Sequence, residues 1–271
     1  GSVLARRDDF KNRLDHLRGR LLHEPRGHAA MVGAVMTEST VADFGAFFVS
    51  SYVYLDMCGH ATIGLARTLV ATGQVELGDE PSSFTLETPA GIVTVTVTRA
   101  QDGAVTASIL NVPSYVEREN FKIDVPEVGT VDATIVCCGG RFILVDATAH
   151  GIAIEPENGS AFCRLGLAIK QAANTVLAEA AGSVLFYCDL DRTHARHLVA
   201  LEANKFDRSP CGTGSSARLA ALHAKGRLDV GETFQAESVL GLRYRCRIEE
   251  TIEHKGHAAI RPRVDGEAWL S

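Results

Sequence analysis

The sequence predicts an α+β protein built from two related halves, each a mainly antiparallel sheet around a central helix. The first observation is a repeated motif: Cys58-Gly59 returns 153 residues later as Cys211-Gly212. The second is that the likeness continues beyond the motif, through Leu69/Leu222, Ala71/Ala224, Gly73/Gly226, Gly78/Gly231, Phe84/Phe234 and Gly91/Gly241. The third is a series of alternating, strand-like segments separated by short turns. We therefore expect a first half over residues 1–130, completed by C-terminal strands, and a second half over 131–271.

The first half begins with leucines at helical spacing, which predict an amphipathic helix over 4–22. Residues 41–55 are rich in Phe, Val and Tyr and predict strand that leads into the first cysteine turn. Apolar residues at helical spacing then predict a helix over 61–72, which Gly73 would end as a C-cap. Period-two alternation predicts the strands that follow, over 83–88, 92–98, 104–112, 130–136 and 141–148.

The second half repeats the order of strand, cysteine turn and helix. Its apolar spacing predicts one long helix over 158–180 and a second helix over 216–225, directly after the second cysteine turn at 207–215. Strands are expected over 184–187, 197–201, 233–240 and 242–249. Because the strands of both halves follow one another at short intervals with Gly and Pro turns, they favour antiparallel pairing over βαβ units.

Composition excludes several classes of function. A net charge of -6 opposes binding to nucleic acid or to an anionic membrane. Apolar runs such as residues 133–138 are far shorter than the ~20 residues that span a bilayer. The seven cysteines include no CxxC pair, which favours reduced thiols over a disulfide framework or a zinc site. We expect a cytoplasmic protein without a metal, in which five cysteines are small buried hydrophobes: Cys137, Cys138, Cys163, Cys188 and Cys246.

The two remaining cysteines point to proton transfer at carbon. A helix N-terminus offers unpaired N–H groups and a positive dipole, which stabilise anions and thiolates. Gly59 and Gly212 permit close backbone approach, so the N–H groups after both cysteines could hold a substrate carboxylate. Cys58 as thiolate and Cys211 as thiol, or the reverse, could then remove the α-proton from one face and deliver one to the other. The pattern predicts inversion of an α-carbon, without a cofactor.

His60 and Asp207 each flank one cysteine motif, and two readings of each are open. His60 is either a site group that tunes proton positions or a structural hydrogen-bonding side chain. Asp207 is either a partner for a substrate ammonium or an acid that caps the turn before Ser209-Pro210.

The paired motifs resemble those of the proline racemase family. They are Met-Cys-Gly-His at 57–60 and Asp-Arg-Ser-Pro-Cys-Gly-Thr-Gly at 207–214, and residues 24–28 and 139–142 resemble further family motifs. The resemblance implies the diaminopimelate-epimerase-like fold, with the active site between two similar halves. It matches Cys58 and Cys211 to the acid/base pair. It matches the other site residues as follows: Gly59, His60, Gly212 and Thr213 to the carboxylate cradle, and His60 with Asp207 to groups near the ring nitrogen.

The resemblance implies a racemase or epimerase of proline or 4-hydroxyproline, with a small imino acid as its ligand. One alternative is a trans-3-hydroxy-L-proline dehydratase, but that branch typically has threonine in place of the second cysteine, and this chain has Cys211. The other alternative is a relative that binds imino acids without turning them over. No segment indicates an oligomer interface, and a homodimer is left open.

Overall fold

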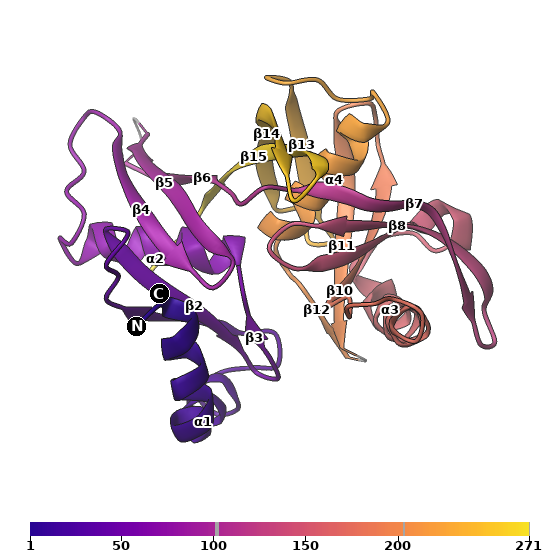
Figure 1. Cartoon of the computed structure of the whole chain (residues 1–271), viewed down its shortest axis with the longest axis horizontal. Coiled ribbons are helices and arrows are strands. Elements are labelled where there is room, and N and C mark those ends of the chain that lie inside the picture. Colours follow the sequence, from indigo (N-terminus) through magenta and orange to yellow (C-terminus); the bar gives the residue numbers. More distant parts are fainter. Residues whose placement is uncertain (101–102, 203, 271) are drawn as a thin grey trace. The chain divides into compact units, whose positions relative to one another are not determined.

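The computed structural model describes residues 1–100, 103–202 and 204–270. In these residues, runs of strands separate single α-helices, as in the α+β class predicted from the sequence (Figure 1). The chain forms two compact units, one made of Gly1–Val112 with the chain from Asp265 onward, the other of Pro113–Val264. The sequence prediction divided the halves at 130/131, whereas the contacts divide the chain after Val112 and return the C-terminal end to the first unit.

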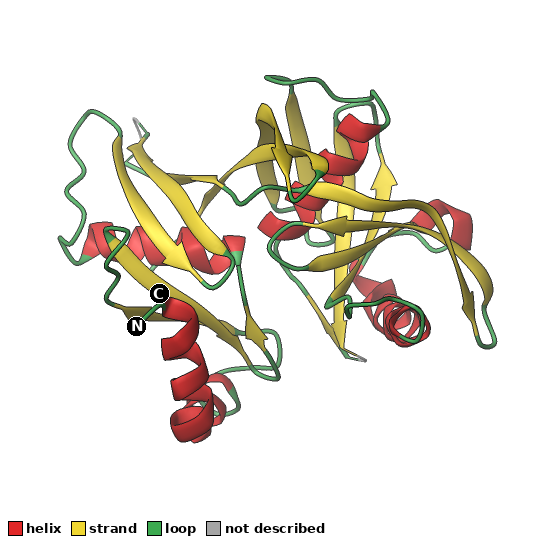
Figure 2. Ribbon diagram, in the orientation of Figure 1, coloured by secondary structure: helices red, strands yellow, loops and turns green. Residues whose placement is uncertain are grey.

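The first unit packs two long helices on one set of strands (Figure 2). Its elements are α1 (Val3–Leu22), β1 (Val32–Thr37), β2 (Phe44–Ser50), β3 (Tyr54–Leu55), α2 (Gly59–Ala71), β4 (Ser82–Thr88), β5 (Gly91–Arg99) and β6 (Val105–Leu110). The strand order is β1-β2-β4-β5-β6, followed by the end of β15 (His257–Glu267). The β1–β2, β4–β5 and β5–β6 pairs are antiparallel, while β2 and β4, on either side of α2 in the sequence, pair in parallel.

The second unit has the larger share of the strands. Its elements are β7 (Tyr115–Val125), β8 (Gly129–Cys137), β9 (Arg141–Asp146), α3 (Gly159–Asn174), β10 (Ser183–Asp189), β11 (His194–Glu202), β12 (Lys205–Phe206), α4 (Gly212–Ala224), β13 (Thr233–Ser238), β14 (Arg243–His254) and most of β15, with 3-10 turns at Ala147–His150 and Pro156–Asn158. The strand order is β15-β14-β13-β11-β10-β9-β8-β7. The β9–β10 and β11–β13 pairs are parallel, and β7–β8, β8–β9, β10–β11 and β13–β14 are antiparallel.

The duplication predicted from the motifs is present in the architecture of the two units. The series β1-β2-β3-α2-β4-β5 in one unit corresponds to β10-β11-β12-α4-β13-β14 in the other. In both, a parallel strand pair flanks a helix of 13 residues. Each helix is followed by a glycine with positive φ, Gly73 at 70° and Gly226 at 63°, a conformation that ends helices and favours glycine. The cysteine turns therefore occupy equivalent places in two copies of one fold.

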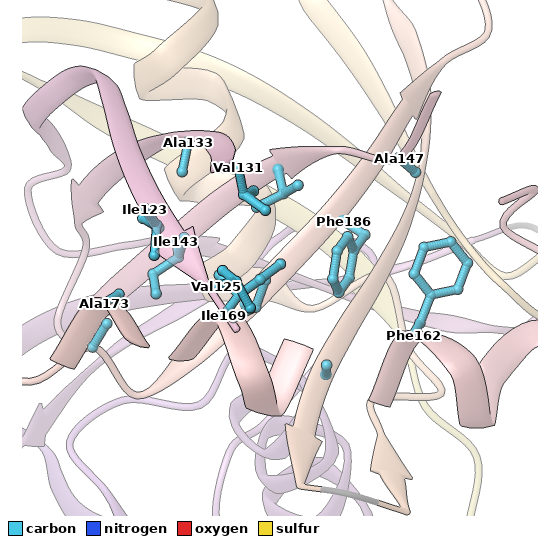
Figure 3. Packing of buried hydrophobic residues seen from close by; sticks show 14 of the residues in the cluster. Ile123, Val125, Val131, Ala133, Ile143, Ala147, Phe162, Ile169, Ala173 and Phe186 are labelled. Carbon is cyan, nitrogen blue, oxygen red and sulfur yellow. The ribbon is translucent and has the colours of Figure 1, made fainter. Parts of the chain in front are cut away.

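The core of the second unit lies between α3 and the strands. Figure 3 shows Phe162 of α3 beside Phe186 of β10. The centroids of the two rings are 4.9 Å apart. Ile169 and Ala173, further along α3, are fully buried in the same cluster. Helix α4 is more enclosed still, because every residue from Gly212 to Leu222 is buried. Such burial fixes the helix firmly, and with it the cysteine turn at its start.

Candidate active site

Both motif cysteines occupy the N-cap position of a helix, as the sequence predicted. Cys58 precedes α2 and Cys211 precedes α4. The two residues are buried to a similar degree, with 6% and 7% of their surface exposed. Cys58 and His60 belong to the first unit, and Asp207, Cys211, Gly212 and Thr213 belong to the second. Each unit therefore contains one thiol at the start of a helix.

The Cys58 side chain does not cap the helix that follows it. Its backbone is extended, with φ -146°, and its side chain accepts no capping hydrogen bond from α2. Its carbonyl accepts hydrogen bonds from the backbone N–H and the hydroxyl of Thr62, at 3.0 Å and 2.9 Å. The sulfur lies 3.9 Å from Nδ1 of His60. This contact places the imidazole beside the thiol, where it could exchange a proton with it or orient it.

The Cys211 thiol is bound directly to the helix that follows it. The backbone N–H of Gly214 donates to Sγ at 3.3 Å, and the hydroxyl of Thr213 lies 3.6 Å from the same atom. Cys211 has φ 63°, a left-handed conformation that non-glycine residues seldom adopt. Its carbonyl accepts a 2.7 Å hydrogen bond from the N–H of Ser215, which begins the helical ladder. The two thiols thus occupy equivalent places but have different surroundings.

Asp207 braces the turn that leads to Cys211. Its Oδ1 accepts hydrogen bonds from the backbone N–H and the hydroxyl of Ser209, at 2.9 Å and 2.8 Å. The Ser209 hydroxyl oxygen in turn accepts from the N–H of Cys211 at 3.1 Å. Asp207 is itself buried, with 9% of its surface exposed, and its N–H donates to the carbonyl of Val199. The turn-capping reading of Asp207 is therefore observed, and a contact with substrate stays a prediction.

Two residues that the sequence did not single out support this turn. The thiol of Cys138 donates to the carbonyl of Thr213 at 3.3 Å, and complete burial raises the pKa of that thiol. Gly214 has no room for a side chain, because a Cβ there would lie 2.7 Å from Cδ1 of Leu185 and 3.1 Å from Sγ of Cys211. The sequence places Cys138 in an apolar strand and Gly214 among small residues. Neither the hydrogen bond of Cys138 nor the close packing at Gly214 could be predicted from neighbouring residues.

A buried charge lies further along α4. Arg218 is 1% exposed, its Nη2 donates to Oδ1 of Asp189 at 2.6 Å, and its guanidinium carbon lies 3.8 Å from the ring centroid of Tyr187. Burial alone would raise the pKa of Asp189, but the charges and hydrogen bonds of Arg218 and Arg227 together outweigh burial, so the pKa is lowered. Burial also lowers the pKa of His197 to about 3, with Arg218 adding to the effect, so this imidazole is neutral. The contacts of Arg218 with Asp189 and Tyr187 tie α4 to β10.

Among residues 1–100, 103–202 and 204–270, no group of three or more His, Cys, Asp or Glu side chains is arranged to hold a metal ion. Within the same ranges, no helix is both long enough and apolar enough to cross a bilayer.

Comparison with known proteins places these features in a family. The family model described as proline racemase matches residues 1–271. The chain is 37% identical to a 4-hydroxyproline 2-epimerase of Streptosporangium roseum over 292 aligned residues, covering 100% of this chain and 85% of the relative. It is 36% identical to a proline racemase of Clostridioides difficile, covering 100% and 84%. A trans-3-hydroxy-L-proline dehydratase of Colwellia psychrerythraea is 32% identical, covering 99% and 79%.

The fold is also that of a solved structure. The crystal structure of a hydroxyproline epimerase from Agrobacterium vitis, with bound trans-4-hydroxy-L-proline, superposes with a TM-score of 0.87 and 25% sequence identity. The superposition covers 93% of this chain and 76% of that one.

Proposed function

The chain belongs to the proline racemase family and is an isomerase, and we propose that it inverts the α-carbon of proline or 4-hydroxyproline with two thiols and without a cofactor. The observation that carries the proposal is the placement of Cys58 and Cys211 at equivalent helix N-termini in two copies of one fold. Inversion requires a base on one face of a carbon and an acid on the other. A duplicated fold with one thiol in each copy is suited to that requirement.

The proposed reaction has two proton transfers. The thiolate of one cysteine takes the α-proton, which breaks the Cα–H bond, makes that cysteine a thiol and leaves a carbanion. The thiol of the other cysteine then gives its proton to the opposite face, which forms the new Cα–H bond and leaves a thiolate. Atoms and charge balance, and the enzyme ends with the two protonation states exchanged.

The substrate carboxylate is proposed to bind the N–H groups that follow the cysteines, at Gly59 and His60 and at Gly212 and Thr213. Helix N-termini bind anions, and fixed N–H dipoles stabilise the charge that develops when the α-carbon is deprotonated. His60, beside Cys58, and Asp207, beside the second motif, are proposed to face the ring nitrogen.

Relatives named for different substrates are about equally similar to this chain, so the ring substituent remains to be tested. The epimerase and the racemase are 37% and 36% identical to it. A second candidate function is dehydration of trans-3-hydroxy-L-proline, favoured by the 32% identical dehydratase. Elimination needs a base on one face only, whereas this chain has a cysteine at both motif positions, so inversion is the stronger proposal.

Incubation in D₂O with each of L-proline, trans-4-hydroxy-L-proline and trans-3-hydroxy-L-proline separates these functions. Inversion together with α-deuteration of either of the first two supports the proposal and identifies the substrate. Formation of a Δ1-pyrroline product from the third would support the dehydratase instead. Binding of the imino acids without exchange or elimination would leave only a binding protein.

A homodimer and a cytoplasmic location stay predictions. Sedimentation analysis of the purified chain tests the first, and fractionation of the source cells tests the second.

A further inference from the structure

We propose that the two thiols are unequal in the resting enzyme, and that Cys211 is the thiolate while Cys58 carries the proton. This inference deepens the proposed two-thiol reaction and rests on it. Equivalent places in a duplicated fold would suggest equivalent groups. The contacts of the two sulfurs differ instead, and they differ in the direction that favours negative charge at Cys211.

The Cys211 sulfur accepts a hydrogen bond from the helix that follows it. At an N-cap position, a side chain normally accepts a hydrogen bond from the N–H two or three residues into the helix. Cys211 does this, because the N–H of Gly214 donates to its Sγ at 3.3 Å. A thiolate accepts such a bond far better than a thiol, and a bond to a charged acceptor is roughly twice as strong as a neutral one. The bond therefore stabilises the ionised form of Cys211.

The backbone around Cys211 is held in the conformation that this hydrogen bond requires. A φ of 63° lies in the left-handed region, which a non-glycine residue seldom adopts. It is maintained by bonds on both sides of the residue, from the N–H of Cys211 to Ser209 Oγ and from the N–H of Ser215 to the Cys211 carbonyl. The close approach also depends on the absence of a side chain at Gly214, whose Cβ would lie 3.1 Å from the sulfur.

The contacts of Cys58 differ from those of Cys211. Its backbone is extended, and within the described structure its sulfur receives no capping hydrogen bond from α2. Its contact is Nδ1 of His60 at 3.9 Å. An S–H group directed at a neutral imidazole nitrogen would serve as a donor, which suits a protonated thiol. Cys58 thus lacks the hydrogen bond that stabilises charge on Cys211, and its neighbour His60 can accept a hydrogen bond from its S–H group.

The assignment of charge to Cys211 determines which substrate enantiomer the resting enzyme can deprotonate. The resting enzyme would take a proton only from the substrate enantiomer whose α-hydrogen faces Cys211. After one inversion the charge would lie on Cys58, a less stabilised position, and the enzyme would return to its resting state by proton exchange or by the reverse reaction.

Alkylation of the substrate-free protein tests the assignment. The full chain is treated at neutral pH with less than one equivalent of iodoacetamide, and the modified cysteine is identified by peptide mass spectrometry. Similar burial, at 6% and 7%, makes the two residues a matched pair for access. We expect Cys211 to react at least about tenfold faster than Cys58, the factor that one pKa unit would produce. Equal rates, or faster reaction at Cys58, would overturn the assignment.

The ultraviolet absorbance of the thiolate provides a second measurement that does not depend on reagent access. Cys211→Ser should remove this absorbance and Cys58→Ser should retain it, and the opposite pattern would also overturn the assignment. Both measurements use the protein without substrate. Failure of the assignment with racemisation intact is therefore distinguishable from failure of the proposed function, in which no imino acid would be inverted whichever thiol reacts.

Discussion

The backbone N–H of Gly214 lies 3.3 Å from Sγ of Cys211 and donates a hydrogen bond to it, and Cys58 receives no such bond from its own helix. The two copies of the fold are thus alike in architecture and unlike at the sulfur atoms. The proposed inversion likewise combines likeness with difference, because it removes a proton at one face of a chiral carbon and adds a proton at the other. Its two half-reactions use equivalent groups in different charge states.

Replacing Gly214 should impair the second thiol. In Gly214→Ala the new Cβ would lie 2.7 Å from Leu185 and 3.1 Å from the Cys211 sulfur, so one of them must move. Because misplacement of a reacting group by about 1 Å can cost 10²-fold, we expect initial racemisation rates to fall roughly tenfold to a hundredfold. Gly64→Ala on α2 is the control, since nothing lies within 4 Å of its Cβ position. Equal rates in the two variants would show that the tight approach is unimportant.

Arg218 should be a major source of stability in the second unit. Arg218→Met removes the 2.6 Å partner of Asp189, and because this carboxylate is 27% exposed and keeps Arg227, the cost should lie below the ~3–5 kcal/mol of a fully buried pair. Arg227→Met removes the other arginine that pairs with Asp189. Nη1 of Arg227 lies 3.0 Å from Oδ2 of Asp189, and the Arg227 side chain is 41% exposed. Exposed pairs contribute about 0–1 kcal/mol, so this control should unfold in urea almost as the parent does. A similar loss in both variants would contradict the account.

His197 should make the protein sensitive to acid. Its pKa is lowered from 6.5 to about 3 by burial, so the unfolded chain binds its proton more readily than the folded protein. Stability should therefore be full above pH 6.5 and be lost as the pH falls from there toward 3. At pH 4 the loss from this group would be about 3 kcal/mol, at ~1.4 kcal/mol for each pKa unit.

Urea unfolding at several pH values measures this dependence. His197→Gln should flatten the decline below pH 6.5, whereas His16→Gln, at an exposed position of α1, should leave it unchanged. An identical acid profile in the parent and in His197→Gln would exclude the imidazole as its cause.

Much of the fold was predictable because local pattern and tertiary role agree. Period-two alternation over 83–88 and 92–98 matches β4 and β5, whose side chains alternate between buried and partly exposed. The strand, cysteine turn and helix order predicted both α2 and α4. The recurrence of that order was enough to predict a duplication that the architecture confirms.

Strands without clean alternation were missed. In β7 the pairing register shifts twice, and Asn120 has positive φ, so its charged residues do not alternate with buried ones. In β15 a proline, Pro262, argues against strand in any sequence-based reading. β1 is half-buried throughout most of its length and has no strong pattern. The helix predicted over 158–180 ends at Asn174, although Leu177 and Ala181 beyond it remain buried in the core.

The site residues remain predictions, and the conformation of their turns had no signal in the sequence. The motifs identify Cys58 and Cys211, but nothing in either motif indicates that only Cys211 adopts a left-handed backbone. The support from Cys138 and Arg218 depends on contacts between residues 75 and 29 positions apart in the chain, which no local pattern encodes.

The most direct test of the two-thiol account is racemisation and α-deuteration in D₂O by the parent, Cys58→Ser and Cys211→Ser, with the substrate identified among proline and 4-hydroxyproline. General acid–base groups contribute about 10²–10⁴-fold, so each variant should lose inversion by at least about a hundredfold. Each should keep, at most, exchange from one face, and the two should exchange opposite enantiomers. Full inversion by either variant would contradict the account.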